Sequence, residues 1–196
     1  AQFTIIISLM TTSAIRKQLR RLRAVEPFPV TPPTTTSIGA DNTATTLPSG
    51  EDLYADMLKS IASAKERVLF ETFIWKSDEV GKKFKQALID ASERGVEVYV
   101  IYDGFANLVV SPTFLTFPAP IRKLRYPVFS VGMLLLSFRR FGRDHRKILV
   151  VDGNIGYVGG YNVGKDYATK WRDTHIKIEG TSAWDLDNAF VDFWNQ

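Results

Sequence analysis

The sequence contains no cysteine and only two histidines among its 196 residues. The lack of cysteine excludes disulfides, thiolate metal sites and a cysteine nucleophile within this chain. Two histidines disfavour a histidine-rich zinc centre, because zinc sites use three or four protein ligands. The apolar run FTIIISLM at 3–10 is far shorter than the roughly 20 residues that span a bilayer. The composition of 45% hydrophobic and 23% charged residues is typical of a globular protein with a core.

The amino-terminal quarter differs in composition from the rest of the chain. Residues 1–25 join the apolar run to a basic cluster at 16–23, the pattern at the cytoplasmic end of a transmembrane helix, and are interpreted as a possible remnant of a membrane anchor. A tail cut from a longer protein is the alternative. Residues 26–48 are rich in Pro and Thr, which predicts a linker or extended arm.

The folded domain is expected over residues 49–196. Hydrophobic periodicity predicts a helix from about 53, a buried strand at 68–75, a helix at 79–93 and a strand at 96–104. This β-α-β order implies neighbouring parallel strands. Further strands are predicted at 147–152, 155–160 and 174–180, with a last helix from 182. We therefore expect an α/β fold with a mixed, largely parallel sheet flanked by helices.

One group of residues stands at fixed spacing in and around the strands predicted at 147–152 and 155–160. It consists of His145, Lys147, Asp152, Gly159, Gly160 and Asn162. Six such positions co-occur by chance on the order of one in 10⁵ chains of this length. His145 and Lys147 are two apart, so their side chains point to the same side, where one can attack a phosphorus while the other holds its oxygens.

The remaining members of the group support the same chemistry less directly. Asp152 could orient a group or cap the turn at 152–154. Gly159 and Gly160 let backbone come close to a bound anion. Asn162 can donate an amide hydrogen bond to a phosphate oxygen.

This pattern, H-x-K-x4-D-x6-G-(G/S)-x-N, resembles the signature of the phospholipase D superfamily. The resemblance implies a catalytic set of His145, Lys147 and Asp152, with His145 as nucleophile or acid/base partner and Asp152 as a supporting carboxylate. It implies that Lys147 and Asn162 bind the substrate phosphate beside Gly159 and Gly160. It implies no metal or cofactor, since lysine replaces the metal as an electrostatic clamp.

Flanking motifs resemble those in the amino-terminal half of bacterial cardiolipin synthases, and the likeness covers about residues 49–196. These motifs are FETFIW, YDGF, RDHRK, VGGYNVG and WRDTHIKIEG. The resemblance places Glu71 near the site, bonded to the nucleophilic histidine; a solvent-facing edge position is the alternative. His175 is either a supporting histidine of the site or, with better odds, a structural histidine held by a neighbouring acid.

The segment 121–147 carries eight cations against the single acid Asp144, and an apolar stretch at 126–138 lies between them. Basic flanks around an apolar segment favour insertion at an anionic membrane interface. An ordinary core helix with solvated ends fits equally well. The net charge of +4 and the pI of about 9.3 suit polyanionic partners, or an ordinary solvated surface.

The function implied by the resemblance is phosphatidyl transfer between phosphatidylglycerol molecules through a phosphohistidine, at the bacterial cytoplasmic membrane. That mechanism needs two histidines, so the second half-site must come from a missing carboxy-terminal half or from a homodimer partner. The alternatives are a phospholipase D that hydrolyses phospholipids, a homodimeric phosphodiesterase or nuclease, and a non-catalytic lipid-binding domain. The apolar stretches favour lipid over nucleic acid.

Overall fold

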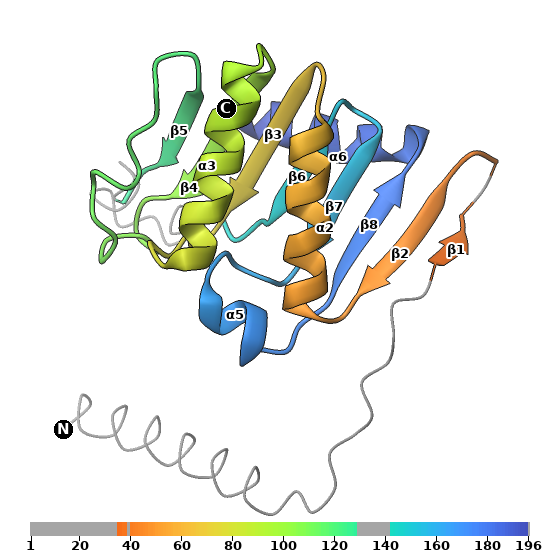
Figure 1. The fold of residues 1–196 in the computed structure, drawn as a ribbon, viewed down its shortest axis with the longest axis horizontal. Helices are drawn as coiled ribbons and strands as arrows, with labels where there is room; N and C mark the ends of the chain where they lie inside the picture. Colours follow the sequence, from red (N-terminus) through yellow and green to blue (C-terminus); the bar gives the residue numbers. More distant parts are fainter. Residues whose placement is uncertain (1–34, 39, 129–141, 196) are drawn as a thin grey trace, which may run out of the picture. The chain divides into compact units, whose positions relative to one another are not determined.

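Eight strands form one sheet in the computed structural model, which describes residues 35–38, 40–128 and 142–195 (Figure 1). The strand order is β1-β2-β8-β7-β6-β3-β4-β5. The strands are β1 (Thr35–Ser37), β2 (Thr43–Leu47), β3 (Arg67–Thr72), β4 (Glu97–Asp103), β5 (Arg122–Tyr126), β6 (Ile148–Val151), β7 (Ile155–Gly159) and β8 (His175–Glu179). The possible anchor at 1–25 and most of the apolar stretch at 126–138 lie outside the described residues.

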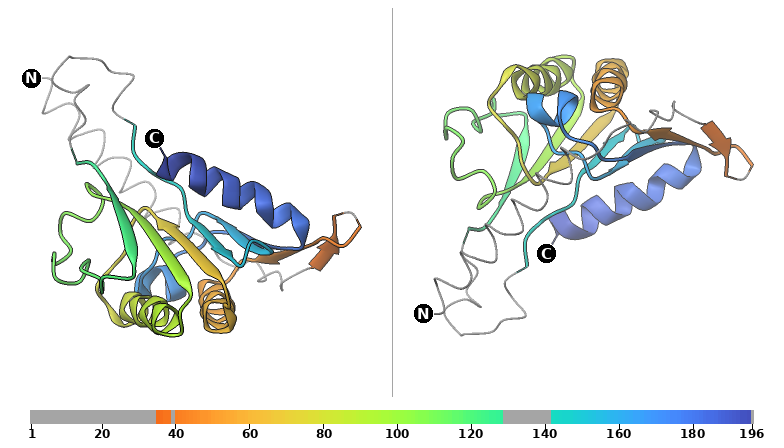
Figure 2. Two further views of the ribbon diagram at one scale, coloured as in Figure 1. Left: turned by 90° about the horizontal axis from the view of Figure 1, so that it is seen from above. Right: turned by 90° about the horizontal axis from the view of Figure 1, so that it is seen from below.

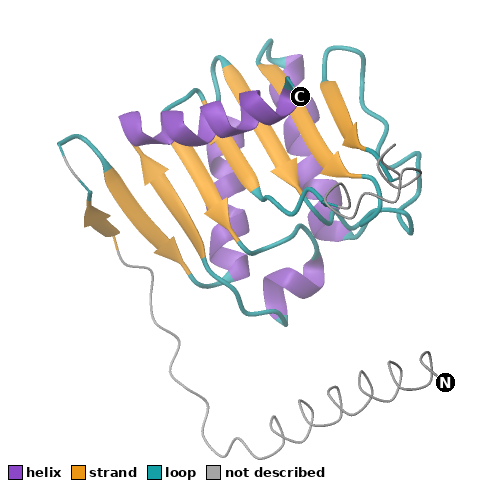
Figure 3. Cartoon of the chain, turned by 180° about the vertical axis from the view of Figure 1, so that it is seen from behind, coloured by secondary structure: helices purple, strands orange, loops and turns teal. Residues whose placement is uncertain are grey.

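Helices cover both faces of the sheet. Helices α2 (Gly50–Ser63) and α3 (Glu79–Glu93) lie on one face, and α6 (Trp184–Trp194) crosses the other (Figures 2 and 3). Two short helical segments, α5 (Lys165–Thr169) and η2 (Thr181–Ala183), complete the domain. No helix within the described ranges has the length and apolarity needed to cross a membrane.

Strand alternation divides the core into two layers. In β3, Val68 and Phe70 belong to the large cluster under α2 and α3, whereas Leu69 joins the smaller cluster with Phe190 of α6. Because side chains alternate across a strand, Glu71 faces the α6 side together with Leu69. The same alternation in β6 determines which face of the sheet the side chains of residues 145–147, just before that strand, point to.

The strand directions correct the prediction of a largely parallel sheet. The α/β class and the mixed sheet are confirmed, but only β3–β4 and β4–β5 pair in parallel, while the other five pairs are antiparallel. The β-α-β rule was correct for β3, α3 and β4. The turn at Asp152–Asn154, with Asp152 and Gly153 at positive φ, then folds β6 back onto β7 as a hairpin, and the later strands continue antiparallel.

Strand β2 corrects the prediction of a linker or arm over 26–48. Thr43–Leu47 pairs along its whole length with β8, and Leu47 is buried in the large core cluster. The folded domain therefore begins before residue 49. Threonine is β-branched and suits a strand. Because the threonines of this region stand beside prolines, however, the composition predicted a linker and strand β2 was missed.

One edge of the sheet collects the residues of interest. The carboxyl ends of β3, β4 and β7 meet the amino ends of β6 and β8 there, because β6 and β8 run opposite to β3. Residues 73–75, 144–147, 160–163 and 173 therefore come together at this edge although they are far apart in sequence.

Candidate active site

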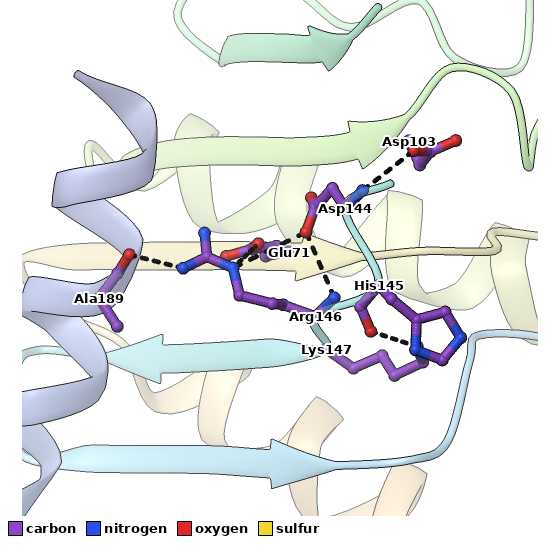
Figure 4. A network of polar contacts seen from close by, with 7 residues as sticks. All are labelled: Glu71, Asp103, Asp144, His145, Arg146, Lys147 and Ala189. Atoms are coloured by element: carbon purple, nitrogen blue, oxygen red, sulfur yellow. Dashed lines mark hydrogen bonds and ion pairs between the residues drawn. The ribbon is translucent and has the colours of Figure 1, made fainter. Parts of the chain in front are cut away.

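Lys147 and His145 lie together against Phe73 at this edge. The Lys147 side chain is buried, and its Nζ donates to the carbonyl oxygen of His145 at 2.5 Å (Figure 4). The same Nζ lies 5.1 Å from the centre of the Phe73 ring. The imidazole of His145 is exposed, with its ring centre 4.5 Å from that of Phe73. The structure thus brings the two residues together, just before β6 rather than within it.

Burial sets the charge state of Lys147. Desolvation lowers its pKa to about 8, although the charges of Asp144 and Asp173 act in the opposite direction. A bound phosphate would favour the ammonium form further, because an opposite charge nearby stabilises a cation. Lys147 is therefore suited to hold an anionic oxygen beside the accessible ring of His145.

Asn162 lies at the same edge but is already engaged. Its Oδ1 accepts from the backbone N–H of Ile74 at 3.1 Å, and its own carbonyl accepts from the hydroxyl of Tyr54. The first bond orients the amide group, and the Asn162 side chain also forms a hydrogen bond with Tyr167.

At both glycines, neighbouring chain fills the space that a side chain would occupy. A Cβ on Gly159 would lie 2.3 Å from the carbonyl oxygen of Thr174 and 2.6 Å from His175, and one on Gly160 would lie 2.1 Å from the Asp173 carboxylate. They are glycines because neighbouring chain occupies the space of a side chain.

Asp173 is a site residue that the sequence reasoning missed. Its carboxylate rests on Gly160, and its charge acts on both Lys147 and His175. The sequence did contain a signal for it, because Asp173 is an acid two residues before His175, at the amino end of a strand that reaches this edge.

His175 is held as a structural, uncharged histidine. It is 2% exposed, and its Nδ1 accepts from the backbone N–H of Tyr161 at 3.3 Å. Burial lowers its pKa to about 4, although the nearby Asp173 opposes the shift. Near neutral pH the ring therefore carries no charge, and the geometry favours the structural alternative.

Glu71 lies close to the site, as expected, but it is bonded to Arg146 and not to a histidine, and it does not face solvent. The carboxyl group is fully buried, and its Oε1 accepts from Arg146 Nε at 2.6 Å (Figure 4). The Arg146 guanidinium also lies 3.7 Å from Asp144 and donates to the carbonyl of Ala189 in α6 at 2.8 Å. This network fastens the segment that carries His145 and Lys147 to the α6 face.

The two acids of the network, Glu71 and Asp144, both have raised pKa values, chiefly because they are buried. Burial and the neighbouring Asp144 raise the pKa of Glu71 to about 8 despite Arg146. Burial likewise raises the pKa of Asp144. We infer that the pair holds a proton at neutral pH.

The raised pKa of Glu71 predicts a pH-dependent stability. An acid whose pKa is higher in the folded state stabilises the fold below its unfolded pKa, and this contribution is lost as pH rises to about 8. Between pH 6.5 and 7.5, below the pKa of Lys147, the melting temperature of the wild type should fall by a few degrees. Glu71→Gln should flatten the profile in thermal melts; an equal slope in the variant would contradict the assignment.

Asp152 lies at the opposite edge of the sheet, which corrects its inclusion in the catalytic set. Five residues of strand separate it from Lys147, roughly 16 Å at about 3.3 Å per residue. Its carboxylate accepts three backbone N–H bonds, at 2.9, 2.8 and 2.9 Å, from Lys65, Glu66 and Arg67. Burial opposes the shift, but these bonds hold the pKa of Asp152 below its ordinary value.

Asp152→Ala is therefore expected to reduce stability and not chemistry. Loss of three hydrogen bonds to a carboxylate should lower the free energy of unfolding by roughly 2–3 kcal/mol, measured by denaturant titration. Asp152→Asn is the matched control, because asparagine tolerates the positive φ and keeps an acceptor oxygen. Loss of turnover per folded molecule in Asp152→Ala would instead place this residue in the reaction.

The arrangement matches that of solved structures with little sequence in common. NucT from Helicobacter pylori superposes with a TM-score of 0.62 at 16% identity, covering 79% of this chain and 95% of that one. The phospholipase D family member Nuc from Salmonella typhimurium gives 0.56 at 19%, covering 78% and 95%. Phosphatidylserine synthase from Haemophilus influenzae gives 0.61 at 19%, covering 82% and 38%. These likenesses show that the chain has the fold of the phospholipase D family member Nuc.

Sequence comparison narrows the class to one family. The family described as "Cardiolipin synthase, PLD-like domain" matches residues 57–194, and this chain belongs to it. It is 34% identical over 168 residues to the major cardiolipin synthase of Bacillus subtilis, covering 80% of this chain. It is 36% identical over 151 residues to cardiolipin synthase 1 of Staphylococcus aureus, covering 74%. The chain spans 34% and 31% of these two relatives' lengths.

Proposed function

We propose that this chain supplies one half-site of a cardiolipin-synthase-type phosphatidyltransferase, which moves a phosphatidyl group between two phosphatidylglycerol molecules. The observation that carries the proposal is the exposed ring of His145 beside the buried ammonium of Lys147, in a chain of this family. The pair offers a nucleophile and an anion clamp at one accessible edge of a rigid sheet.

The first step forms a phosphohistidine. A neutral ring nitrogen of His145 attacks the phosphorus of one phosphatidylglycerol, an N–P bond forms, and the P–O bond to the headgroup glycerol breaks. A histidine of a second half-site gives its proton to the leaving alkoxide, so that glycerol departs neutral. Lys147 and the amide of Asn162 stabilise the charge on the phosphoryl oxygens.

The second step returns the enzyme to its starting state. The headgroup hydroxyl of a second phosphatidylglycerol attacks the phosphorus, and the second histidine takes its proton. The N–P bond breaks as the new P–O bond forms, which yields cardiolipin. With water as the acceptor, the same steps would release phosphatidic acid.

The second histidine must come from outside this chain, because His175 is buried and engaged in the fold. The relatives, of which this chain matches about a third, offer room for another half-site in the same polypeptide. Pairing of two copies across a two-fold axis is the alternative. We place the active protein at the bacterial cytoplasmic membrane, where its lipid substrates reside.

The test is lipid analysis after incubation of the full-length protein, in detergent, with labelled phosphatidylglycerol. Cardiolipin and free glycerol in equal amounts are expected. Phosphatidic acid alone would make the protein a phospholipase. Cleavage of a nucleic-acid control without lipid turnover would reject the lipid assignment and make a homodimeric phosphodiesterase site the next model to test.

A further inference from the structure

The loop after β4 exposes apolar side chains in an unusual concentration. Seven large hydrophobic residues are exposed within the described ranges, and three of them lie in this loop: Phe105 at 53%, Leu108 at 56% and Val109 at 86%. The other four are scattered over the domain. Exposed apolar side chains gathered in one loop in this way mark a place of contact with another molecule or a membrane.

The exposure is built into the fold, because the base of the loop is held by buried polar groups. Asp103 Oδ1 accepts from the backbone N–H groups of Phe105 and Ala106, both at 2.8 Å. The amide of Asn107 donates to the carbonyls of Phe73 and Asp103 at 2.8 and 2.7 Å. With its backbone fixed in this way, the loop presents its apolar side chains outward.

Cations lie close to the loop, and the neighbouring acids Asp103 and Asp144 are buried. A cavity of about 470 Å³ behind Leu108 is lined by Lys123 and Arg125. On the other side, the guanidinium of Arg143 lies 4.7 Å from the centre of the Phe105 ring. The sequence has no acidic residue from Gly104 to Arg143.

The loop adjoins the candidate active site. Asp103 joins the two, since its Oδ2 accepts from the backbone N–H of Asp144 at 3.2 Å, one residue before His145. The loop and His145 therefore stand at the same edge of the sheet. Trp184, itself 62% exposed, stands at the opposite edge beside Asp152 and provides an internal reference.

We propose that Phe105, Leu108 and Val109, together with Lys123, Arg125 and Arg143, form a docking surface for an anionic phospholipid bilayer. The apolar side chains enter the headgroup region while the cations contact lipid phosphates. This docking would bring His145 to the level of the phosphodiesters that it attacks. The role given to this docking rests on the proposed function. The test of lipid contact below does not depend on that function.

Charge favours a bilayer over a protein as the occupant. A second copy of this chain would bring the same cation-rich surface against this one, and like charges repel. The phosphates of an anionic bilayer are complementary to the cations, and its headgroup region can accept the apolar side chains at the same time. Each Lys or Arg near such a surface strengthens association several-fold, at about 1 kcal/mol per residue.

The deciding experiment measures lipid contact at single positions. The full-length protein is reconstituted into vesicles, with a unique cysteine introduced as Val109→Cys or, as the matched control, Trp184→Cys, and labelled with the fluorophore NBD. This chain contributes no cysteine of its own. Vesicles of phosphatidylglycerol or of phosphatidylcholine carry a nitroxide quencher on their acyl chains, and iodide serves as the aqueous quencher.

The expected result is strong nitroxide quenching at position 109 in phosphatidylglycerol, weaker quenching in phosphatidylcholine, and iodide quenching alone at position 184. Equal iodide quenching at both positions would overturn the proposal. Equal nitroxide quenching in the two lipids would overturn its anionic part. Shielding of position 109 before lipid is added would mean that another part of the protein covers the loop, which also overturns it.

A second measurement separates docking from chemistry. Leu108→Ser combined with Val109→Ser should lower the initial rate on phosphatidylglycerol vesicles by at least about tenfold, since each buried aliphatic side chain is worth about 1.5–3 kcal/mol, while the rate in detergent micelles stays unchanged. An equal loss in both would overturn docking as the cause. His145→Ala should retain the quenching at position 109, so failure of the proposed reaction and failure of docking are distinguishable.

Discussion

Replacement of His145 by alanine in the full-length protein is expected to lower phosphatidyl transfer by at least about 10⁴-fold. The ring nitrogen is the proposed attacking atom, and without it no phosphohistidine forms. The exposed imidazole contributes little to packing, so the melting temperature should stay close to that of the wild type. The measurement is the initial rate of cardiolipin formation, with a thermal melt of the same sample.

The other histidine supplies the control. His175→Ala removes a buried ring and its bond to the backbone of Tyr161, so it should lower the melting temperature clearly. The two variants should therefore separate: one loses turnover at unchanged stability, and the other loses stability. Retained cardiolipin formation in His145→Ala would reject the assignment of the nucleophile.

Replacement of Arg146 by methionine is expected to destabilise the fold by about 3 kcal/mol. The guanidinium is the cation beside the buried carboxyl groups of Glu71 and Asp144, and removing one partner of a buried ionic network leaves the others uncompensated. Arg146 is itself about one-third exposed, which keeps the loss at the lower end of the range. Chemical denaturation at pH 7 measures the change.

The double variant Arg146→Met with Glu71→Gln tests the cause. At pH 9, above the raised pKa of Glu71, neutralising this residue removes the uncompensated charge, so the double variant should be more stable than Arg146→Met alone. Turnover should also fall in Arg146→Met, because the arginine fastens the segment before β6 to α6 through Ala189. Equal stabilities of the single and double variants would show that the loss comes from packing against Phe193 and not from charge.

The sequence by itself determined the elements with a strong local signal. The motif from His145 to Asn162 led to the correct superfamily and family, because its chemistry depends on residue type and spacing. The β3-α3-β4 unit and the β6–β7 hairpin were also predictable, since apolar periodicity and the turn at Gly153 are local properties of the chain.

Only the tertiary structure decided which residues share the site. Spacing along a strand reports separation and face, but not which neighbouring strand lies alongside. Antiparallel pairing of β6 with β3 sends Asp152 to the far edge, and it places Glu71 beside Arg146 instead of His145. The contacts of β8 fill the space at Gly159, while Asp173 fills that at Gly160. These assignments follow from long-range pairing, which depends on the packing of the whole sheet. Among them only Asp173, two residues before His175, had a local sequence signal.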